Sequence, residues 1–340
     1  MRVLFLVYPR IGLNRGGLQI QIEKTAEGLE KLGVEVLFYD PWKNQIEDVD
    51  ICHVFSIDPS MSYHLRRAKE MERPIVASPV FNVFEIPAWL IKLKVMLSEN
   101  VPGMCAGLAL SKFMLKSSQR ILALNGREKD LLTRIFGLES QKCTVIPNGI
   151  NKTFGSGIPQ LFEEKYGIKD YVLEVGAVGR RKNQLNLIKA VAGSPYSLVI
   201  IGGPAGGDEK YMNQCKDIAS DNVFFIGEVS NNDPLLASAF AAAKLFVLPS
   251  YSEVMPLTLY EAAVAGCKII VSQNVPVSEK IAPYVQTFNP DDVNRLIQLI
   301  DHEMKTPKNN VLMDIAAKFP TWMDVAERIK DVYEEVLSEK

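Results

Sequence analysis

The chain has 340 residues, 47% of them hydrophobic and 23% charged, and its formal net charge at pH 7 is −2. This composition is typical of an ordinary globular protein, and the length exceeds the roughly 250–300 residues at which single cores stop growing, so two domains are expected. The small net charge argues against a general nucleic-acid binder.

The N-terminus and the cysteines predict a cytoplasmic protein. The first residues, MRVLFLVYPR, become polar too soon for a signal peptide, and no apolar run approaches the roughly 20 residues of a membrane span. The five cysteines are scattered and form no CxxC pair, which is typical of reduced core thiols rather than of a metal cluster or a disulfide framework. A peripheral position at the inner face of the membrane stays open.

Short apolar segments alternate with helical patterns over residues 1–150. They are rich in Val, Ile, Leu and Phe and predict buried strands at 3–8, 34–40, 50–56, 74–80, 120–125 and 143–148. The runs are nearly continuous in hydrophobicity, as in parallel strands that are covered on both faces. This alternation predicts a doubly wound α/β domain.

Two glycines lie between the first strand and the first helix. Gly16 and Gly17, in RIGLNRGGLQIQ, allow a ligand to approach the backbone closely, and the start of the helix favours an anion. The loop is not a GxGxxG, so it does not predict dinucleotide binding.

Residues 85–120 interrupt the alternation. They carry five basic residues against two acidic ones, together with Trp89 and several Leu and Met; the basic residues are Lys92, Lys94, Lys112, Lys116 and Arg120. A basic amphipathic stretch can lie on an anionic membrane surface. The sequence favours the other interpretation, a pair of ordinary covering helices with solvated lysines, and leaves a peripheral membrane contact of the N-terminal domain open.

The alternation restarts after residues 148–159, whose Gly, Asn and Pro predict a linker. Further strands are predicted at 171–177, 197–203, 222–228, 244–250 and 268–273. They indicate a second Rossmann-like domain over 151–320, followed by an amphipathic helix at 321–340. Ligands of such sheets bind beyond the carboxyl ends of the strands, so we expect the site in a cleft between the two domains.

A basic triplet follows the first strand of the second domain. Arg180, Arg181 and Lys182 precede a helix at the carboxyl edge of the sheet, where phosphates are expected. A diphosphate leaving group needs positive charge nearby, because negative charge builds up on it in the transition state. We therefore predict this role for Lys182 and one of the arginines, although most surface triplets of this kind are only solvated.

Two glutamates lie eight positions apart in PSYSEVMPLTLYEAAVAG. Glu253 follows a strand and Glu261 lies inside the next helix, which begins near Pro256. The backbone N–H groups of Leu257 and Thr258 form a natural phosphate site. The unit predicts a sugar at Glu253, a diphosphate at the helix end and a ribose at Glu261. The alternative is a pair of solvated helix carboxylates.

The order of these motifs resembles the retaining, nucleotide-sugar-dependent glycosyltransferases of family 4, which have the GT-B fold. The resemblance covers nearly the whole chain: GGLQIQIEKTAEGLEKLGVEV, VIPNGI, VGAVGRRKN, the E-x7-E element from Glu253 to Glu261, and TWMDVAERIKDVYEEVL. Each motif is modest alone, and five in this order are specific. The resemblance implies that Glu253 contacts the donor sugar, that Glu261 contacts the ribose, and that Lys182 and Arg181 neutralise the diphosphate.

Other roles are implied by the same resemblance. The backbone from Gly227 to Val229 would hold the base, and the Gly16–Gly17 loop would approach the donor phosphate and the acceptor. The helix at 321–340 would cross back to the N-terminal domain. No metal or other cofactor is implied, and the DVD at 48–50 is not interpreted as a metal motif.

The implied activity is transfer of a sugar, with retention of configuration, from a nucleoside diphosphate sugar to a glycan, a lipid-linked glycan or a small molecule. The chain has Ala177 where the family often has Arg, and VASPVFNVFE lacks the family's common His. Two alternatives therefore stay open: another GT-B nucleotide-sugar enzyme, such as an epimerase or hydrolase, and a catalytically silent binding protein. A nicotinamide-dependent enzyme is not favoured, because neither half has a GxGxxG after a strand.

Overall fold

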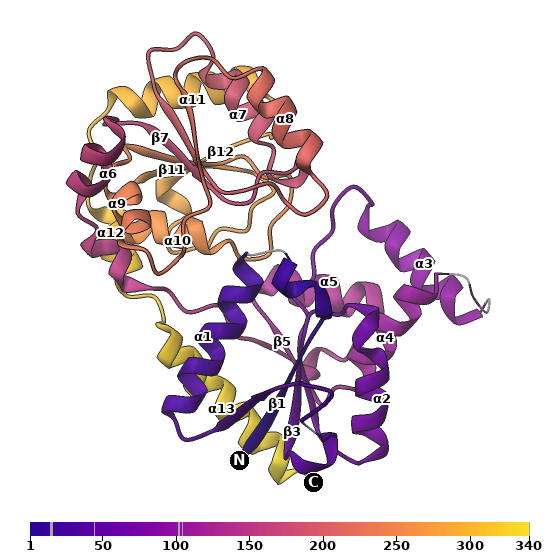
Figure 1. Cartoon of the computed structure of the whole chain (residues 1–340). Helices are drawn as coiled ribbons and strands as arrows, with labels where there is room; N and C mark the ends of the chain where they lie inside the picture. The colour runs from indigo at the N-terminus through magenta and orange to yellow at the C-terminus, as the bar shows by residue number, and fades with distance from the viewer. Residues whose placement is uncertain (14–15, 44, 101–102, 104, 340) are drawn as a thin grey trace. The chain divides into compact units, whose positions relative to one another are not determined.

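The computed structural model describes residues 1–13, 16–43, 45–100, 103 and 105–339. The chain divides into two compact units, one formed by Met1–Gly149 with Trp322–Lys340 and the other by Ile150–Thr321. Each unit is a six-stranded parallel sheet with helices around it (Figure 1). The predicted class, α/β with two Rossmann-like domains as in the GT-B fold, is confirmed.

The first sheet has the strand order β2-β1-β3-β4-β5-β6. Its strands are β1 (Arg2–Val7), β2 (Glu35–Phe38), β3 (Ile51–Phe55), β4 (Ile75–Ser78), β5 (Arg120–Ala123) and β6 (Cys143–Val145). The helices of this unit are α1 (Gly17–Lys31), α2 (Ser62–Glu70), α3 (Ala88–Asn100), α4 (Ala106–Ser117), α5 (Gly126–Phe136) and α13 (Trp322–Ser338). The strands lie where the apolar segments predicted them, because both faces of the sheet are covered.

The C-terminal helix α13 packs against α1 in the first unit (Figure 1). A Cβ atom on Gly28 of α1 would lie 2.6 Å from Cβ of Ala326, so a glycine permits this close approach. Tyr333 on α13 has its hydroxyl 2.5 Å from Nδ1 of His53, whose Nε2 lies 2.9 Å from Oγ of Ser78. Burial lowers the pKa of His53 to about 3, so the ring stays neutral and has a structural role.

The second sheet has the order β12-β11-β10-β7-β8-β9. Its strands are β7 (Val172–Val175), β8 (Leu198–Ile201), β9 (Val223–Gly227), β10 (Leu245–Leu248), β11 (Lys268–Ser272) and β12 (Val285–Phe288). Its helices are α6 (Pro159–Tyr166), α7 (Gln184–Val191), α8 (Glu209–Asp217), α9 (Pro234–Ala242), α10 (Leu257–Val264), α11 (Val293–Lys305) and α12 (Val311–Ala316). The edge strand β12 was not predicted, because its two central residues are exposed and its apolar run is short.

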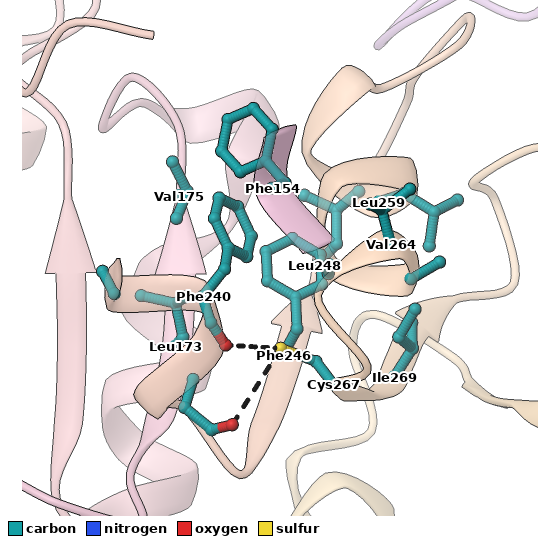
Figure 2. Packing of buried hydrophobic residues seen from close by; sticks show 14 of the residues in the cluster. Phe154, Leu173, Val175, Phe240, Phe246, Leu248, Leu259, Val264, Cys267 and Ile269 are labelled. Atoms are coloured by element: carbon teal, nitrogen blue, oxygen red, sulfur yellow. Dashed lines mark hydrogen bonds between the residues drawn. The ribbon is translucent and has the colours of Figure 1, made fainter. Parts of the chain in front are cut away.

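Most of the predicted linker is packed into the second unit. Phe154 is fully buried, and its ring meets that of Phe240 edge-on with 5.3 Å between the centroids (Figure 2). A Cβ atom on Gly157 would lie 2.2 Å from the carbonyl oxygen of Ala237, so only glycine fits there. The second unit begins at Ile150, so most of the residues interpreted as a linker belong to it.

Among the residues that the structure describes, no helix is long and apolar enough to cross a bilayer.

Candidate functional site

The loop after β7 carries the basic triplet, and it is fixed to the carboxyl edge of the second sheet. Arg180–Lys182 form a single 3-10 turn, and Asn183 follows with φ +60, a left-handed conformation that Asn tolerates better than most residues. The buried amide of Asn183 donates to the carbonyl of Pro249, at 3.2 Å, and to that of Pro290, at 2.9 Å. The triplet is therefore anchored beside the loop that follows β10.

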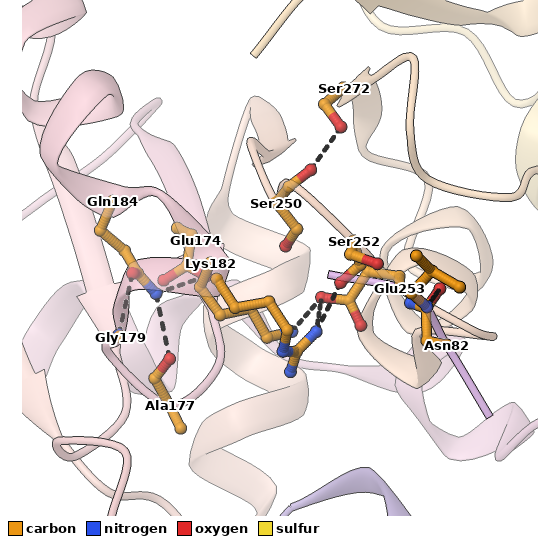
Figure 3. Close-up of polar contacts among 12 residues, drawn as sticks. Asn82, Glu174, Ala177, Gly179, Lys182, Gln184, Ser250, Ser252, Glu253 and Ser272 are labelled. Atoms are coloured by element: carbon orange, nitrogen blue, oxygen red, sulfur yellow. Dashed lines mark hydrogen bonds and ion pairs between the residues drawn. The ribbon is translucent and has the colours of Figure 1, made fainter. Parts of the chain in front are cut away.

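Glu253 forms ion pairs with two of the three basic side chains. Its Oε1 lies 2.8 Å from Nζ of Lys182 and 3.0 Å from Nη1 of Arg181 (Figure 3). Arg181 also donates from Nη1 to the carbonyl of Ser252 at 2.6 Å. The side chain of Arg181 is 43% exposed, whereas those of Lys182 and Glu253 are nearly buried. Three residues predicted from two separate motifs thus form one cluster.

The charge state of this cluster follows from its burial. Burial alone would raise the pKa of Glu253, but Lys182 and Arg181 outweigh it and, with the Ser250 hydroxyl, lower that pKa. Glu253 is therefore ionised at neutral pH. Two cations then face one carboxylate, which leaves one positive charge for an anionic ligand.

The N-terminus of α10 lies directly after this cluster in the chain. The helix begins at Leu257, and its N-cap residue, Pro256, makes no side-chain capping hydrogen bond. The first N–H groups of a helix have no intrahelical acceptor, so those of Leu257 and Thr258 are suited to an anion. The phosphate role of the two residues stays a prediction.

Glu261 lies one turn further along α10 and is 5% exposed. Its Oε1 accepts a hydrogen bond of 2.9 Å from Nδ2 of Asn231, in the loop after β9. Burial raises the pKa of Glu261 to about 7, while the Asn231 bond acts in the opposite direction. The same loop begins at Gly227, with φ +83, and continues through Val229, so it reaches Glu261. Asn231 was missed because one amide in a polar loop carries no sequence signal.

Gly16 and Gly17 lie at the start of α1, in the first unit. Gly16 has φ 179, an extended conformation open to any residue, and a Cβ atom there would meet nothing within 4 Å. Within that unit, then, backbone strain does not require the glycine. The neighbouring Asn14 and Arg15 lie outside the described residues.

Comparisons with known proteins give a consistent result. The family model described as glycosyl transferases group 1 matches residues 161–319. The chain is similar to an O-antigen chain mannosyltransferase of Salmonella typhimurium, with 30% identity over 190 residues that cover 54% of this chain and 50% of the relative. It is also similar to an Escherichia coli UDP-Gal:alpha-D-GlcNAc-diphosphoundecaprenol alpha-1,3-galactosyltransferase, with 26% identity over 68% of this chain and 64% of the relative.

The fold is shared with a solved structure of the Anabaena protein HepE in complex with UDP-glucose. The TM-score is 0.75 at 14% identity, and the match covers 98% of this chain and all of that one. The chain spans only about half the length of the first curated relative. Every donor-side residue described above, from Lys182 to Glu261, falls inside the matched segment. The match to the glycosyl transferases group 1 model thus lies within the second unit, the one that carries these residues.

Proposed function

We propose that the protein transfers a sugar from a nucleoside diphosphate sugar to an acceptor, without a metal ion and with retention of anomeric configuration. The observation that carries the proposal is the contact of Lys182 and Arg181 with one oxygen of Glu253. This contact lies in the segment that matches the glycosyl transferases group 1 model, just before the start of α10. Retention rests on the resemblance to family 4.

The charges of the cluster suit the departure of a nucleoside diphosphate. As the sugar bond breaks, negative charge develops on the diphosphate, and positioned cations stabilise it. Lys182 and Arg181 supply two positive charges, and the N–H groups of Leu257 and Thr258 add the partial charge of a helix end. A metal ion would normally supply the same neutralisation, so these groups can replace it.

The two carboxylates suit the two sugars of the donor. Ionised Glu253 can accept hydrogen bonds from hydroxyls of the transferred sugar while it orients both cations. Glu261 can accept from ribose hydroxyls when the donor displaces the Asn231 amide. The backbone between Gly227 and Val229, in the loop that also carries Asn231, would hold the base.

A donor screen tests the proposal. Purified protein is offered UDP-, GDP- and ADP-sugars with and without glycan or lipid-linked acceptors, and nucleoside diphosphate release is measured. We expect release that depends on the acceptor and that persists in excess chelator. Release without acceptor would indicate a hydrolase instead, and binding without release a silent binding protein. Loss of turnover in chelator, restored by Mg²⁺ or Mn²⁺, would contradict metal independence.

The acceptor and the location are proposed from the names of two relatives. The names of the two curated relatives place them on O-antigen chains and on a diphosphoundecaprenol-linked sugar, which supports a glycan or lipid-linked acceptor for this chain. Enzymes of that kind work where nucleotide sugars and lipid carriers meet. We therefore propose a cytoplasmic protein that binds peripherally to the inner face of the membrane.

Helix α3 supports this membrane contact. A row of exposed apolar side chains lies in and just before it: Ile86 (38%), Trp89 (68%), Leu93 (43%), Met96 (52%) and Leu97 (39%). Lys92 is exposed on the same helix, which suits an anionic surface. Arg120, counted above with the basic residues of this region, instead pairs with Glu339. Val101, Pro102 and Met104 lie outside the described residues.

Vesicle binding provides the test of this contact. We expect the protein to sediment with vesicles that contain phosphatidylglycerol and less with pure phosphatidylcholine, because both apolar burial and charge contribute. Leu93→Glu should abolish sedimentation. Trp42→Ala is the matched control, since Trp42 is 92% exposed outside α3. Equal sedimentation of wild type and Leu93→Glu would exclude α3 as the contact.

A further inference from the structure

Strand β7 contains a carboxyl group that none of the roles above uses. Glu174 is fully buried in the second sheet, with 0% exposure. Its Oε1 accepts a hydrogen bond of 3.3 Å from Nε2 of Gln184, and its Oε2 has no hydrogen-bond partner among the residues that the structure describes. A buried polar atom without a partner is costly, so the position requires an explanation.

The surroundings of Glu174 connect it to the loop that carries Lys182. The amide of Gln184 also donates to the carbonyl of Ala177 at 3.2 Å and accepts from the N–H of Gly179 at 3.2 Å (Figure 3). The Gln184 side chain thus joins the Glu174 carboxyl to both sides of the β7–α7 loop. The Glu174 carboxyl therefore helps to hold the conformation of this loop through the hydrogen bonds of Gln184.

Gly176 shows how close Glu174 comes to the cation. A Cβ atom built on Gly176 would lie 3.3 Å from Oε1 of Glu174 and 3.4 Å from Nζ of Lys182. The carboxyl and the ammonium group therefore flank the same point. Lys182 consequently has Glu253 on one side, at 2.8 Å, and Glu174 on another.

We propose that Glu174 is a positioning residue for Lys182, and that the site binds the donor diphosphate when the Glu174 carboxyl is neutral. The inference rests on the proposed function, because it concerns the same diphosphate site. A neutral carboxyl leaves the charge of Lys182 to the phosphates. An ionised Glu174 adds a second carboxylate next to Lys182, which competes with the phosphates for it.

The charged and titratable groups around Glu174 determine the pH range over which its carboxyl loses its proton. Burial raises the pKa of Glu174 to about 8, Lys182 and the Gln184 bond act to lower it, and Glu253 acts to raise it. From α8, Cys215 also faces this carboxyl, and burial raises the pKa of its thiol to about 11. The thiol thus stays neutral over the range in which Glu174 titrates.

The sign of the effect follows from proton linkage. Below about pH 8 the Glu174 carboxyl is neutral, and above it the carboxyl loses its proton. If diphosphate binding requires the proton, the dissociation constant is nearly flat below this pKa and rises about tenfold for each pH unit above it. Between pH 7 and pH 9 we therefore expect a rise of about tenfold.

The experiment measures binding of a nucleoside diphosphate to the full chain by calorimetry at pH 7, 8 and 9. UDP, GDP and ADP are tried, and the tightest binder is used. Wild type should lose about tenfold in affinity from pH 7 to pH 9, whereas Glu174→Gln should lack this loss, and the smaller dependence left in the variant belongs to Glu261, whose pKa is about 7. Glu209→Gln, which alters an exposed glutamate of the same domain, should behave as wild type. Titration of the ligand's own phosphate affects all three proteins equally.

A second measurement needs no variant. Calorimetry of the wild type at pH 8 in buffers of different ionisation enthalpy should show net proton uptake on binding. A wild-type affinity that is constant from pH 7 to pH 9, or a Glu174→Gln variant with the wild-type pH dependence, would overturn the inference while leaving the proposed function intact. Failure of all three nucleotides to bind at any pH would instead contradict the proposed function.

Discussion

Lys182→Ala should lower turnover by about 10²–10³-fold, because it removes a cation from the position where charge develops on the leaving diphosphate. In the ligand-free protein Lys182 lies 2.8 Å from Glu253 and its side chain is only 13% exposed. Its charge is therefore weakly screened by solvent. Steady-state kinetics with the donor found in the screen measure the effect.

The same change also removes one partner of a buried ion pair, so folding must be checked separately. Arg181 stays 3.0 Å from the same oxygen of Glu253, and it limits the cost of leaving a buried carboxylate unpaired. We expect a lower melting temperature but a folded protein at assay temperature. Arg180→Ala is the matched control: this arginine belongs to the same triplet, but it is exposed, and its loss should leave turnover unchanged. A folded Lys182→Ala variant with wild-type turnover would remove Lys182 from the site.

The sequence predicted most of the fold because the buried parallel strands are nearly continuous apolar runs. It failed where burial is partial: in β12 only Val285 and Phe288 are buried, and the strand lies at the sheet edge. It also misjudged residues 148–159, because turn-forming composition hides one large buried side chain, Phe154. Local composition reports turns well, but it does not report what a turn packs against.

Part of the site could also be predicted from the sequence. Lys182, Arg181 and Glu253 could be placed together, because the carboxyl ends of parallel strands meet at one edge of a sheet. Asn231, the partner of Glu261, could not be placed, since a single amide in a polar loop carries no sequence signal. Glu174 did leave a signal, a single acid inside the apolar run YVLEVG. A charged residue in a strand covered on both faces must be buried, and a buried acid with a shifted pKa indicates a functional region.

Glu253→Gln and Glu261→Gln should impair the enzyme in different ways. Glu253 is ionised and orients both cations next to the transferred sugar, where charge changes most as the bond breaks. Its loss should lower turnover by on the order of 10²-fold, with a smaller effect on the donor KM, because interactions that strengthen in the transition state affect turnover.

Glu261 lies on the ribose side, where its hydrogen bonds are the same in the ground state and the transition state. Assayed at pH 8, above the Glu261 pKa of about 7, Glu261→Gln should therefore raise the donor KM by about tenfold or more, the worth of a hydrogen bond to a charged group. Turnover should change little, as uniform binding requires. Glu279→Gln, at an exposed position of the same domain, should change neither constant. If Glu253→Gln and Glu261→Gln also kept wild-type turnover and a wild-type donor KM, both carboxylates would be excluded from donor binding. A different outcome would be that Glu253→Gln and Glu261→Gln both show a large fall in turnover, a large rise in the donor KM and a lower melting temperature. That result would mean that the two glutamates act on the fold of the domain rather than on the donor.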